Sequence, residues 1–151
     1  HEKWLSGDHQ VTIVWTDDET GLRLKARPDC IHVDDDGKLW VVDLKTTIET
    51  EAAGFVRSCW KYGYVEQAAH YIDGVSRALG EVAGFIFVAV GKAAPHIVRA
   101  YQCADEMIVS GYRRRDEALA RIAMHNELDD WTEVEDREPT IIGAQEISFD
   151  D

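Results

Sequence analysis

The segment Lys38-Leu39-Trp40-Val41-Val42-Asp43-Leu44-Lys45 predicts the centre of the fold. Its middle is apolar on both faces, as in a strand buried inside a sheet, and a charged pair stands at its end. Because the side chains of a strand alternate between its two faces, we expect Asp43 and Lys45 on the same face. Burying charges at the end of a central strand is costly unless they are paired or bind a metal ion.

The residues upstream of this segment have the composition of further strands. β-Branched and aromatic residues dominate 11–15, and residues 22–27 alternate between apolar and polar with a period of two. Pro28 lacks the donor that a sheet ladder needs and ends the second segment, and residues 30–33 form a short strand. The sequence therefore predicts a meander of strands that ends with residues 38–45.

Two helices, two strands and a long helix are predicted to follow. The helical pattern covers residues 49–60 and resumes as an apolar stripe over residues 65–79. Residues 83–90 and 96–102 are typical of strands, and residues 104–128 form an amphipathic helix. We expect an α/β (α+β) fold in which helices flank a central mixed β-sheet.

The chain is strongly acidic, with 16 Lys and Arg residues against 29 Asp and Glu residues and a net charge of −13. Proteins that coat DNA use basic residues to displace counterions from phosphates, so this composition excludes a general DNA-coating protein. It is compatible with an enzyme that grips DNA in a local basic channel. Residues 129–151 hold many of the acids and are predicted to be a peripheral tail on a single domain of residues 1–151.

The lack of long apolar runs and the number and spacing of the cysteines favour a cytoplasmic protein with no membrane partner. No apolar run approaches the roughly 20 residues that span a bilayer. Cys30, Cys59 and Cys103 are odd in number and far apart, which fits neither a disulfide framework nor a metal-binding spacing and indicates structural thiols. The first residue is His1 rather than Met, so we expect the domain to be truncated at its N-terminus.

Asp29 and Asp43 are the candidate metal ligands. Both stand at the ends of strands that we expect to be adjacent, so their carboxylates can clamp a hard cation such as Mg²⁺, with the carbonyl of Leu44 as a further oxygen ligand. Lys45 can then orient or help to deprotonate an attacking water and stabilise charge that develops on a phosphate. The alternative that the residues alone leave open is a surface ion pair at a strand end.

The motif Pro28-Asp29…Asp43-Leu44-Lys45 resembles the signature of the PD-(D/E)xK nuclease superfamily. The surrounding stretches resemble, more narrowly, the RecE-type 5′→3′ exonucleases that phages and prophages often encode. These stretches are Trp15-Thr16-Asp17, Lys25-Ala26-Arg27, Asp43-Leu44-Lys45-Thr46-Thr47 and Tyr62-Gly63-Tyr64…Gln67-Ala68-Ala69…Tyr71. The Gln67…Tyr71 element discriminates best, because short acidic motifs recur by chance.

The resemblance implies a restriction-endonuclease-like core and a metal-dependent exonuclease. Such an enzyme digests one strand of double-stranded DNA from its 5′ end and leaves a 3′ overhang for a single-strand-annealing recombinase. Relatives of this type form rings around DNA, so the resemblance also implies a ring-shaped homo-oligomer. The cofactor implied is Mg²⁺, with Mn²⁺ as an alternative, in a site for two ions.

The resemblance also assigns roles to five residues. Asp29 and Asp43 would be metal ligands and Lys45 the catalytic lysine. Gln67 and Tyr71 lie four apart on the second helix, so they share one face, which the family pattern places at the active site.

One departure from the family pattern concerns a further metal ligand on a helix upstream of the first strand. Only ten residues precede the first predicted strand, too few for that helix and its loop. The candidates that remain are His1, Glu2, Asp8 and His9, and the sequence does not distinguish among them.

Contacts with DNA need basic residues near the site. Lys25 and Arg27 lie along one face of the strand that leads to Asp29, and Arg57 and Lys61 lie four apart on the first helix. The aromatic rings of Tyr62 and Tyr64 are suited to stacking on an unpaired base, and Thr46 follows the catalytic lysine. Arg113-Arg114-Arg115 spreads over most of a helical turn, which is typical of a solvated face.

Two other readings of the chain are open. A RecB-like nuclease of CRISPR adaptation commonly carries a four-cysteine iron–sulfur cluster, and the three scattered cysteines argue against it. A catalytically idle DNA-binding module would keep the fold without the chemistry. Intact Asp29, Asp43 and Lys45 argue against that module, and the missing upstream ligand argues for it.

Overall fold

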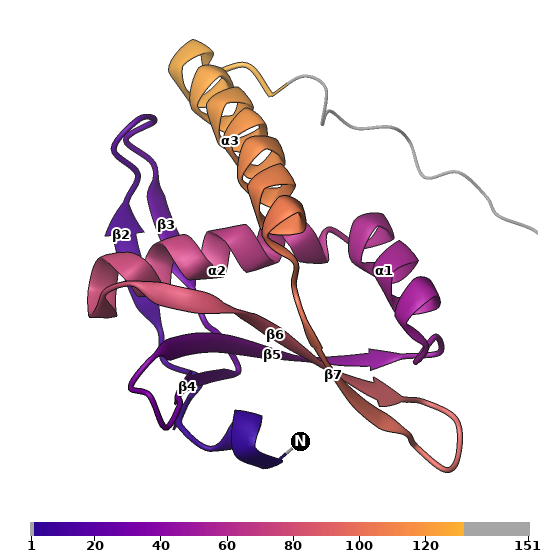
Figure 1. The fold of residues 1–151 in the computed structure, drawn as a ribbon. Coiled ribbons are helices and arrows are strands. Elements are labelled where there is room, and N and C mark those ends of the chain that lie inside the picture. The colour runs from indigo at the N-terminus through magenta and orange to yellow at the C-terminus, as the bar shows by residue number, and fades with distance from the viewer. Residues whose placement is uncertain (1, 132–151) are drawn as a thin grey trace, which may run out of the picture.

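Strand β5 lies at the centre of a five-stranded sheet of order β1-β4-β5-β6-β7 (Figure 1). The structure, a computed structural model, describes residues 2–131, so His1 and most of the acidic tail predicted over 129–151 lie outside the described residues. The five strands are Asp8–His9, Cys30–Val33, Leu39–Thr47, Val82–Gly91 and Val98–Gln102. The β5–β6 pair is parallel and the other pairs are antiparallel, which confirms the predicted mixed sheet.

The parallel β5–β6 pair requires a long connection, which α1 (Ala52–Lys61) and α2 (Tyr64–Leu79) supply. Both helices lie on one face of the sheet (Figure 1). Between helices and sheet lies an apolar core that includes Phe55 of α1 and Phe85 and Phe87 of β6, all at most 2% exposed. This face of the sheet also carries the odd-numbered residues of β5.

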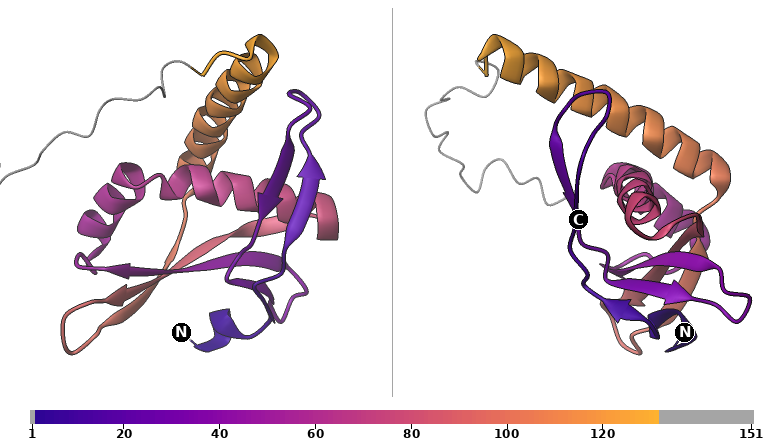
Figure 2. Two further views of the ribbon diagram at one scale, coloured as in Figure 1. Left: turned by 180° about the vertical axis from the view of Figure 1, so that it is seen from behind. Right: turned by 90° about the vertical axis from the view of Figure 1, so that its left-hand side faces the viewer.

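The first predicted hairpin does not join the central sheet. β2 (Ile13–Thr16) and β3 (Arg23–Ala26) pair with each other as a separate two-stranded sheet. The predicted alternation of buried and exposed side chains is confirmed, because Leu24 and Ala26 are buried. The hairpin packs on α2, however, rather than joining the central sheet (Figure 2). Trp15 lies so close to Gly74 of α2 that a Cβ there would come within 2.6 Å of the indole. The predicted meander therefore divides at Pro28, and only its last part enters the central sheet.

The opposite face of the sheet is covered by the short 3-10 helix η1 (Glu2–Leu5). Trp4 packs edge-on against His32 and Trp40, with ring centroids 5.4 and 5.3 Å away. Trp4 and Leu5 thereby cover a second apolar cluster around Val42. Nothing in the apolar periodicity of the sequence predicted this covering segment.

Helix α3 (Asp105–Leu128) crosses α2 and projects beyond it (Figure 2). The crossing is close at Gly111, where a Cβ would lie 2.2 Å from the carbonyl oxygen of Val65. Ion pairs between Arg114 and Glu66 and between Arg115 and Asp73 hold the two helices together. Among residues 2–131 no helix is both long and apolar enough to cross a bilayer.

Gly111→Ala is expected to lower the free energy of unfolding by about 1–2 kcal/mol. Overpacking against the Val65 carbonyl costs about 1–3 kcal/mol, and the better helix propensity of Ala offsets up to about 1 kcal/mol of it. Urea unfolding followed by circular dichroism measures the change. Val109→Ala on the exposed side of α3 is the control, and a Gly111→Ala chain as stable as the parent would contradict the close crossing.

All three thiols are expected to be unreactive in the folded chain. Burial raises the pKa of Cys59 to about 12 and that of Cys103 to about 11, and it also raises the pKa of Cys30. A disulfide reagent attacks the thiolate, so at pH 8 we expect no reaction before unfolding and three equivalents after it. The folded-state pKa values of these thiols exceed those in the unfolded chain. The contribution of the protonated thiols to the free energy of unfolding is therefore complete below about pH 9 and is lost as pH rises through 11–12. Rapid labelling of the native chain would show that a thiol is accessible.

Candidate active site

Asp29 and Asp43 meet at one end of the β4–β5 pair. Cys30 pairs with Val42, so the next residues outward on the two strands are Asp29 and Asp43. The Asp29 carboxylate accepts a hydrogen bond of 2.8 Å from the backbone N–H of Leu44, which fixes it against β5. The Asp43 side chain points to the helix side of the sheet and is buried. The two carboxylates therefore lie together at the edge of the buried core.

The Lys45 ammonium is held from three sides. It forms an ion pair with Asp43, which confirms that the two side chains share one face of β5, and donates a hydrogen bond of 2.7 Å to Gln67 Oε1. It also lies 4.6 Å from the centre of the Tyr64 ring. Gln67 and Tyr64 stand three residues apart in the first turns of α2, so one helix supplies both contacts. Gln67 Nε2 lies 3.5 Å from Asp43 Oδ1 and closes the group.

The electrostatics of this group favour a further cation. Burial raises the pKa of Asp43, the Lys45 ammonium lowers it by charge and hydrogen bonding, and the Asp29 carboxylate raises it again. The net direction is upward, so one ammonium does not fully compensate for two neighbouring carboxylates and their burial. A divalent cation beside both carboxylates would favour their ionised forms.

The oxygen donors present fit a hard divalent ion. Asp29, Asp43 and the carbonyl of Leu44 offer the ligand type that Mg²⁺ prefers. Within residues 2–131 no three His, Cys, Asp or Glu side chains are grouped as a complete metal-binding cluster, so a bound ion would also need backbone, water or phosphate oxygens.

His9 is the upstream candidate that the structure brings to the site. Strand β1 pairs with β4, so that His9 stands opposite Cys30, and His9 Nδ1 lies 3.3 Å from the backbone carbonyl of Asp29. Asp8 lies one position further from the site, opposite Ile31, and Glu2 lies in η1 on the other face of the sheet. The sequence offered no means of ranking these residues, because the β1–β4 pairing joins segments 20 residues apart.

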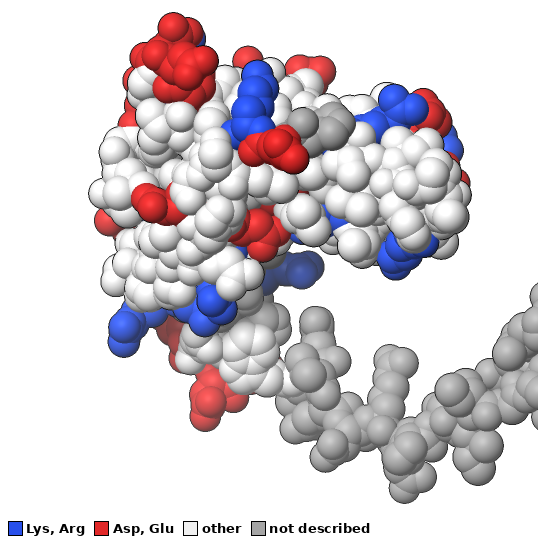
Figure 3. Space-filling view, turned by 90° about the horizontal axis from the view of Figure 1, so that it is seen from below, with Lys and Arg blue, Asp and Glu red and all other residues white. Residues whose placement is uncertain are grey.

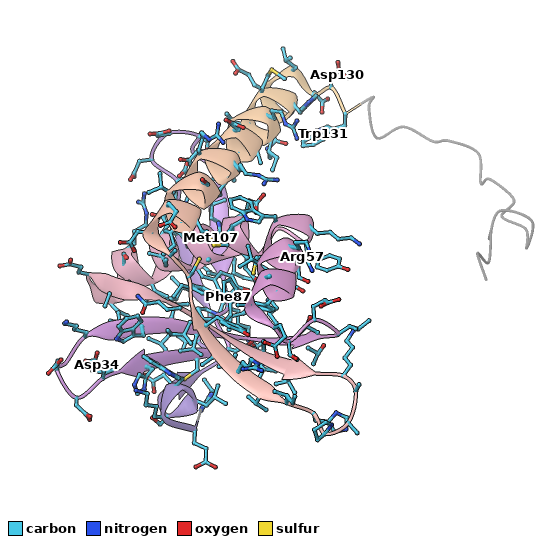
Figure 4. All side chains as sticks on the ribbon, turned by 45° about the vertical axis from the view of Figure 1, so that its right-hand side comes forward. Asp34, Arg57, Phe87, Met107, Asp130 and Trp131 are labelled. Carbon is cyan, nitrogen blue, oxygen red and sulfur yellow. The ribbon has the colours of Figure 1, made fainter. Side chains whose placement is uncertain are left out.

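Four of the predicted DNA-binding residues line one hollow beside this group. This α1 hollow, about 710 Å³ in volume, is lined by residues that include Thr46, Arg57, Lys61, Tyr62, Tyr64 and Lys92. Figure 4 shows Arg57 projecting outward from α1, away from Phe87 in the core. Lys92 was missed by sequence reasoning because it lies in the β6–β7 turn, far along the chain from β5. Its backbone N–H bonds the Thr47 carbonyl at 2.9 Å.

The remaining predicted residues lie outside the α1 hollow. The Arg27 guanidinium bonds the carbonyl and side-chain oxygens of Gln10 at 3.1 and 3.0 Å, and so fixes the segment that follows His9. The backbone carbonyl of Lys25 contacts His70, while its side chain is exposed. Tyr71 packs against the main core cluster, one turn along α2 from Gln67.

Substitutions of Tyr64 are expected to show whether the face of its ring holds the Lys45 ammonium in place. Tyr64→Phe keeps the ring face and should leave the position of Lys45 unchanged, whereas Tyr64→Leu removes a contact of about 0.5–2 kcal/mol. The ring shifts the Lys45 ε-methylene proton resonance upfield, so ¹H–¹³C spectra of lysine-labelled chain measure it, with Lys45→Arg to assign the signal. A signal unchanged in Tyr64→Leu would contradict the contact.

Comparison with known proteins places the fold in a family. Residues 1–135 match the model of the family described as "PDDEXK-like domain of unknown function (DUF3799)". Among the curated proteins, none matches the chain.

Two crystal structures share the fold. One is a protein from Eubacterium rectale named a "putative exonuclease", which has 21% identity and a TM-score of 0.64 and is matched over 99% of this chain and 59% of its own. The other, SSO0001, has 18% identity and a TM-score of 0.50 over 78% of this chain and 52% of its own. This chain thus spans less than two thirds of either protein, and at these identities the likeness shows the fold alone. The family match confirms the predicted superfamily and fold class, and the chain belongs to the family of PDDEXK-like domains of unknown function.

Proposed function

We propose that this chain is a metal-dependent deoxyribonuclease that hydrolyses phosphodiester bonds from DNA ends. The observation that carries the proposal is the Lys45 ammonium held between Asp43, Gln67 and Tyr64 beside a second carboxylate, Asp29. Membership of a PDDEXK-like family supports it, and so does the fold shared with a protein named as an exonuclease.

In the proposed reaction, Asp29, Asp43 and the Leu44 carbonyl would hold Mg²⁺ or Mn²⁺, in a site for two ions. When bound, such an ion would supply charge neutralisation at the phosphate and make a water molecule easier to deprotonate. Lys45 donates hydrogen bonds toward a non-bridging phosphate oxygen and the attacking water. Attack of the water oxygen forms a new P–O bond, while the bond from phosphorus to the leaving sugar oxygen breaks; the attacking water gives up one proton to solvent and the leaving oxygen takes one up to become a hydroxyl. Gln67 orients the Lys45 ammonium throughout.

The proposed DNA contacts fall into two groups. Thr46, Arg57, Lys61 and Tyr64 line the α1 hollow, beside the reacting phosphate. Lys25 and Arg27 lie toward the hairpin side, and Tyr71 supports the α2 face that carries Gln67. On the face seen in Figure 3, basic and acidic side chains are interspersed rather than gathered in one field.

The finer features of the proposal follow from the motif resemblance. They are digestion of duplex DNA in the 5′→3′ direction, a 3′ overhang handed to a single-strand-annealing recombinase, and a ring-shaped homo-oligomer in the cytoplasm of a bacterium or phage host. The net negative charge suits a ring, because a ring retains DNA by topology and needs basic residues only along its channel.

Lys45→Ala and Asp43→Asn are each expected to lower nucleotide release by at least about a hundredfold, because each removes a charge from the reacting centre. The assay is digestion of end-labelled linear duplex DNA with Mg²⁺ and with EDTA. Labels at the 5′ and 3′ ends report the direction of digestion.

Lys38→Ala is the matched control, because Lys38 is exposed at the opposite end of β5. It should digest DNA at the rate of the parent chain. Release that persists in EDTA, or that survives in Lys45→Ala, would contradict the proposed chemistry. A parent chain that binds no divalent ion and releases no nucleotide would favour the idle binding module.

A further inference from the structure

The α1 hollow is assembled from three segments that are distant in the sequence. The end of β5 and the following loop contribute Thr46, α1 contributes Arg57 and Lys61, and the β6–β7 turn contributes Lys92. The parallel register of β5 and β6 brings the last segment in, since Thr47 pairs with Gly91. The hollow therefore forms only when β5 and β6 are paired.

Within the described part of the chain, the cations of the α1 hollow have no acidic partners. Arg57, Lys61 and Lys92 form no ion pair with any of residues 2–131, whereas Arg77, Arg99, Arg114 and Arg115 all do. Glu49 is the acid that lines the hollow, and its side chain lies against Gly54 in the first turn of α1. The hollow thus carries two more positive charges than negative ones, in a chain whose total charge is −13. Such a local excess favours a polyanion.

Aromatic rings form a second component of the α1 hollow. The centres of the Tyr62 and Tyr64 rings are 5.8 Å apart, and Lys61 Nζ lies 5.3 Å from the Tyr62 ring. Tyr64 is fixed by Phe55 and Phe87, while Tyr62 is 59% exposed. An exposed ring next to unpaired cations is the arrangement with which proteins stack bases of a single strand.

The walls of the α1 hollow are held in place by contacts with β7. The Tyr101 hydroxyl donates to the Thr50 carbonyl at 2.5 Å, and Arg99 forms an ion pair with Glu51. The Thr47 hydroxyl bonds the backbone of Glu49. The loop between β5 and α1 is thus fixed before any ligand arrives, which lowers the entropic cost of binding.

We propose that the α1 hollow binds an unpaired DNA strand, with backbone phosphates against Arg57, Lys61 and Lys92 and a base stacked on Tyr62. This rests on the proposed function, and it specifies the form of the substrate. A base in the interior of a duplex has both faces covered by its neighbours, so the Tyr62 ring is open to a base that has left the stack or to one at a duplex end, and comparison with a blunt duplex distinguishes the two. Because Tyr64 contacts both the hollow and Lys45, a strand seated there lies beside the reacting group.

Binding in EDTA tests this proposal without hydrolysis. Fluorescence anisotropy compares a labelled single-stranded oligonucleotide with the blunt duplex of the same sequence, at several NaCl concentrations. The parent chain should prefer the single strand. Lys92→Glu should weaken that binding about tenfold. It should also make the fall of log affinity with log salt concentration less steep by about 0.7, the value for one lost phosphate contact. Tyr62→Ala should weaken it about tenfold, and Tyr62→Phe should restore it.

Lys38→Glu is the control for the change in charge. Lys38 is exposed at the start of β5, on the order of 25 Å from Lys92 at the other end of the β5–β6 pair. Equal losses in Lys38→Glu and Lys92→Glu would show a general effect of charge and overturn the proposal. So would equal affinity for duplex and single strand, or no binding of the oligonucleotide by the parent chain. Single-strand binding with these variant effects, in a chain that digests no DNA, would uphold the α1 hollow while the nuclease proposal fails.

Discussion

The parallel pairing of β5 with β6 determines where Tyr64, Gln67 and Lys92 lie relative to Asp43 and Lys45. A parallel pair cannot be joined by a tight turn, so the chain must leave the end of β5, cross the sheet and return to the start of β6. The crossing is made by α1 and α2, and the first turns of α2 arrive above Asp43 and Lys45. The same register sets the end of β6 beside the end of β5, which brings Lys92 to Thr47. The β5–β6 ladder therefore positions the groups that hold the lysine and the distant basic residue, while the β4–β5 ladder sets Asp29 beside Asp43.

The buried Asp43 is the electrostatic counterpart of that geometry. Its side chain lies under α2 at the border of an aromatic core, where an ionised group is costly without a partner. Lys45 and Gln67 compensate only in part for the burial of the Asp43 carboxylate, so the pKa of Asp43 is raised. Two carboxylates, Asp29 and Asp43, thus lie beside a single ammonium at the border of the core. Sites of this kind are common where a protein uses the charge chemically, although structural ion pairs also produce them.

Patterns that operate within one strand or one helix could be predicted from the sequence. The common face of Asp43 and Lys45 follows from period two, and the adjacency of Asp29 follows from a short connection between two strands. That β2 and β3 form a sheet of their own could not be predicted. A strand with one buried face has the same alternating pattern whether that face packs on a sheet or on the helix α2. The places of Lys92 and His9 depend on pairings between strands distant in sequence. The metal ligands and DNA contacts were assigned from a motif, and they remain predictions for experiment.

The candidate site combines residues of elements anchored in the core with a residue of a surface turn, and this affects how the sequence of such a protein can diverge. The reacting groups stand on β5 and the first turns of α2, which are anchored in the core, whereas Lys92 stands in a surface turn closed by a bond between Gly91 and Ile97. Surface turns accept insertions and substitutions at little cost in stability, because few buried contacts depend on them. On the proposed function, exchange of the 92–97 turn between relatives would therefore alter which nucleic acid is preferred, while Asp43, Lys45 and Gln67 keep their places. The fold thus divides the candidate site between a surface turn and elements anchored in the core.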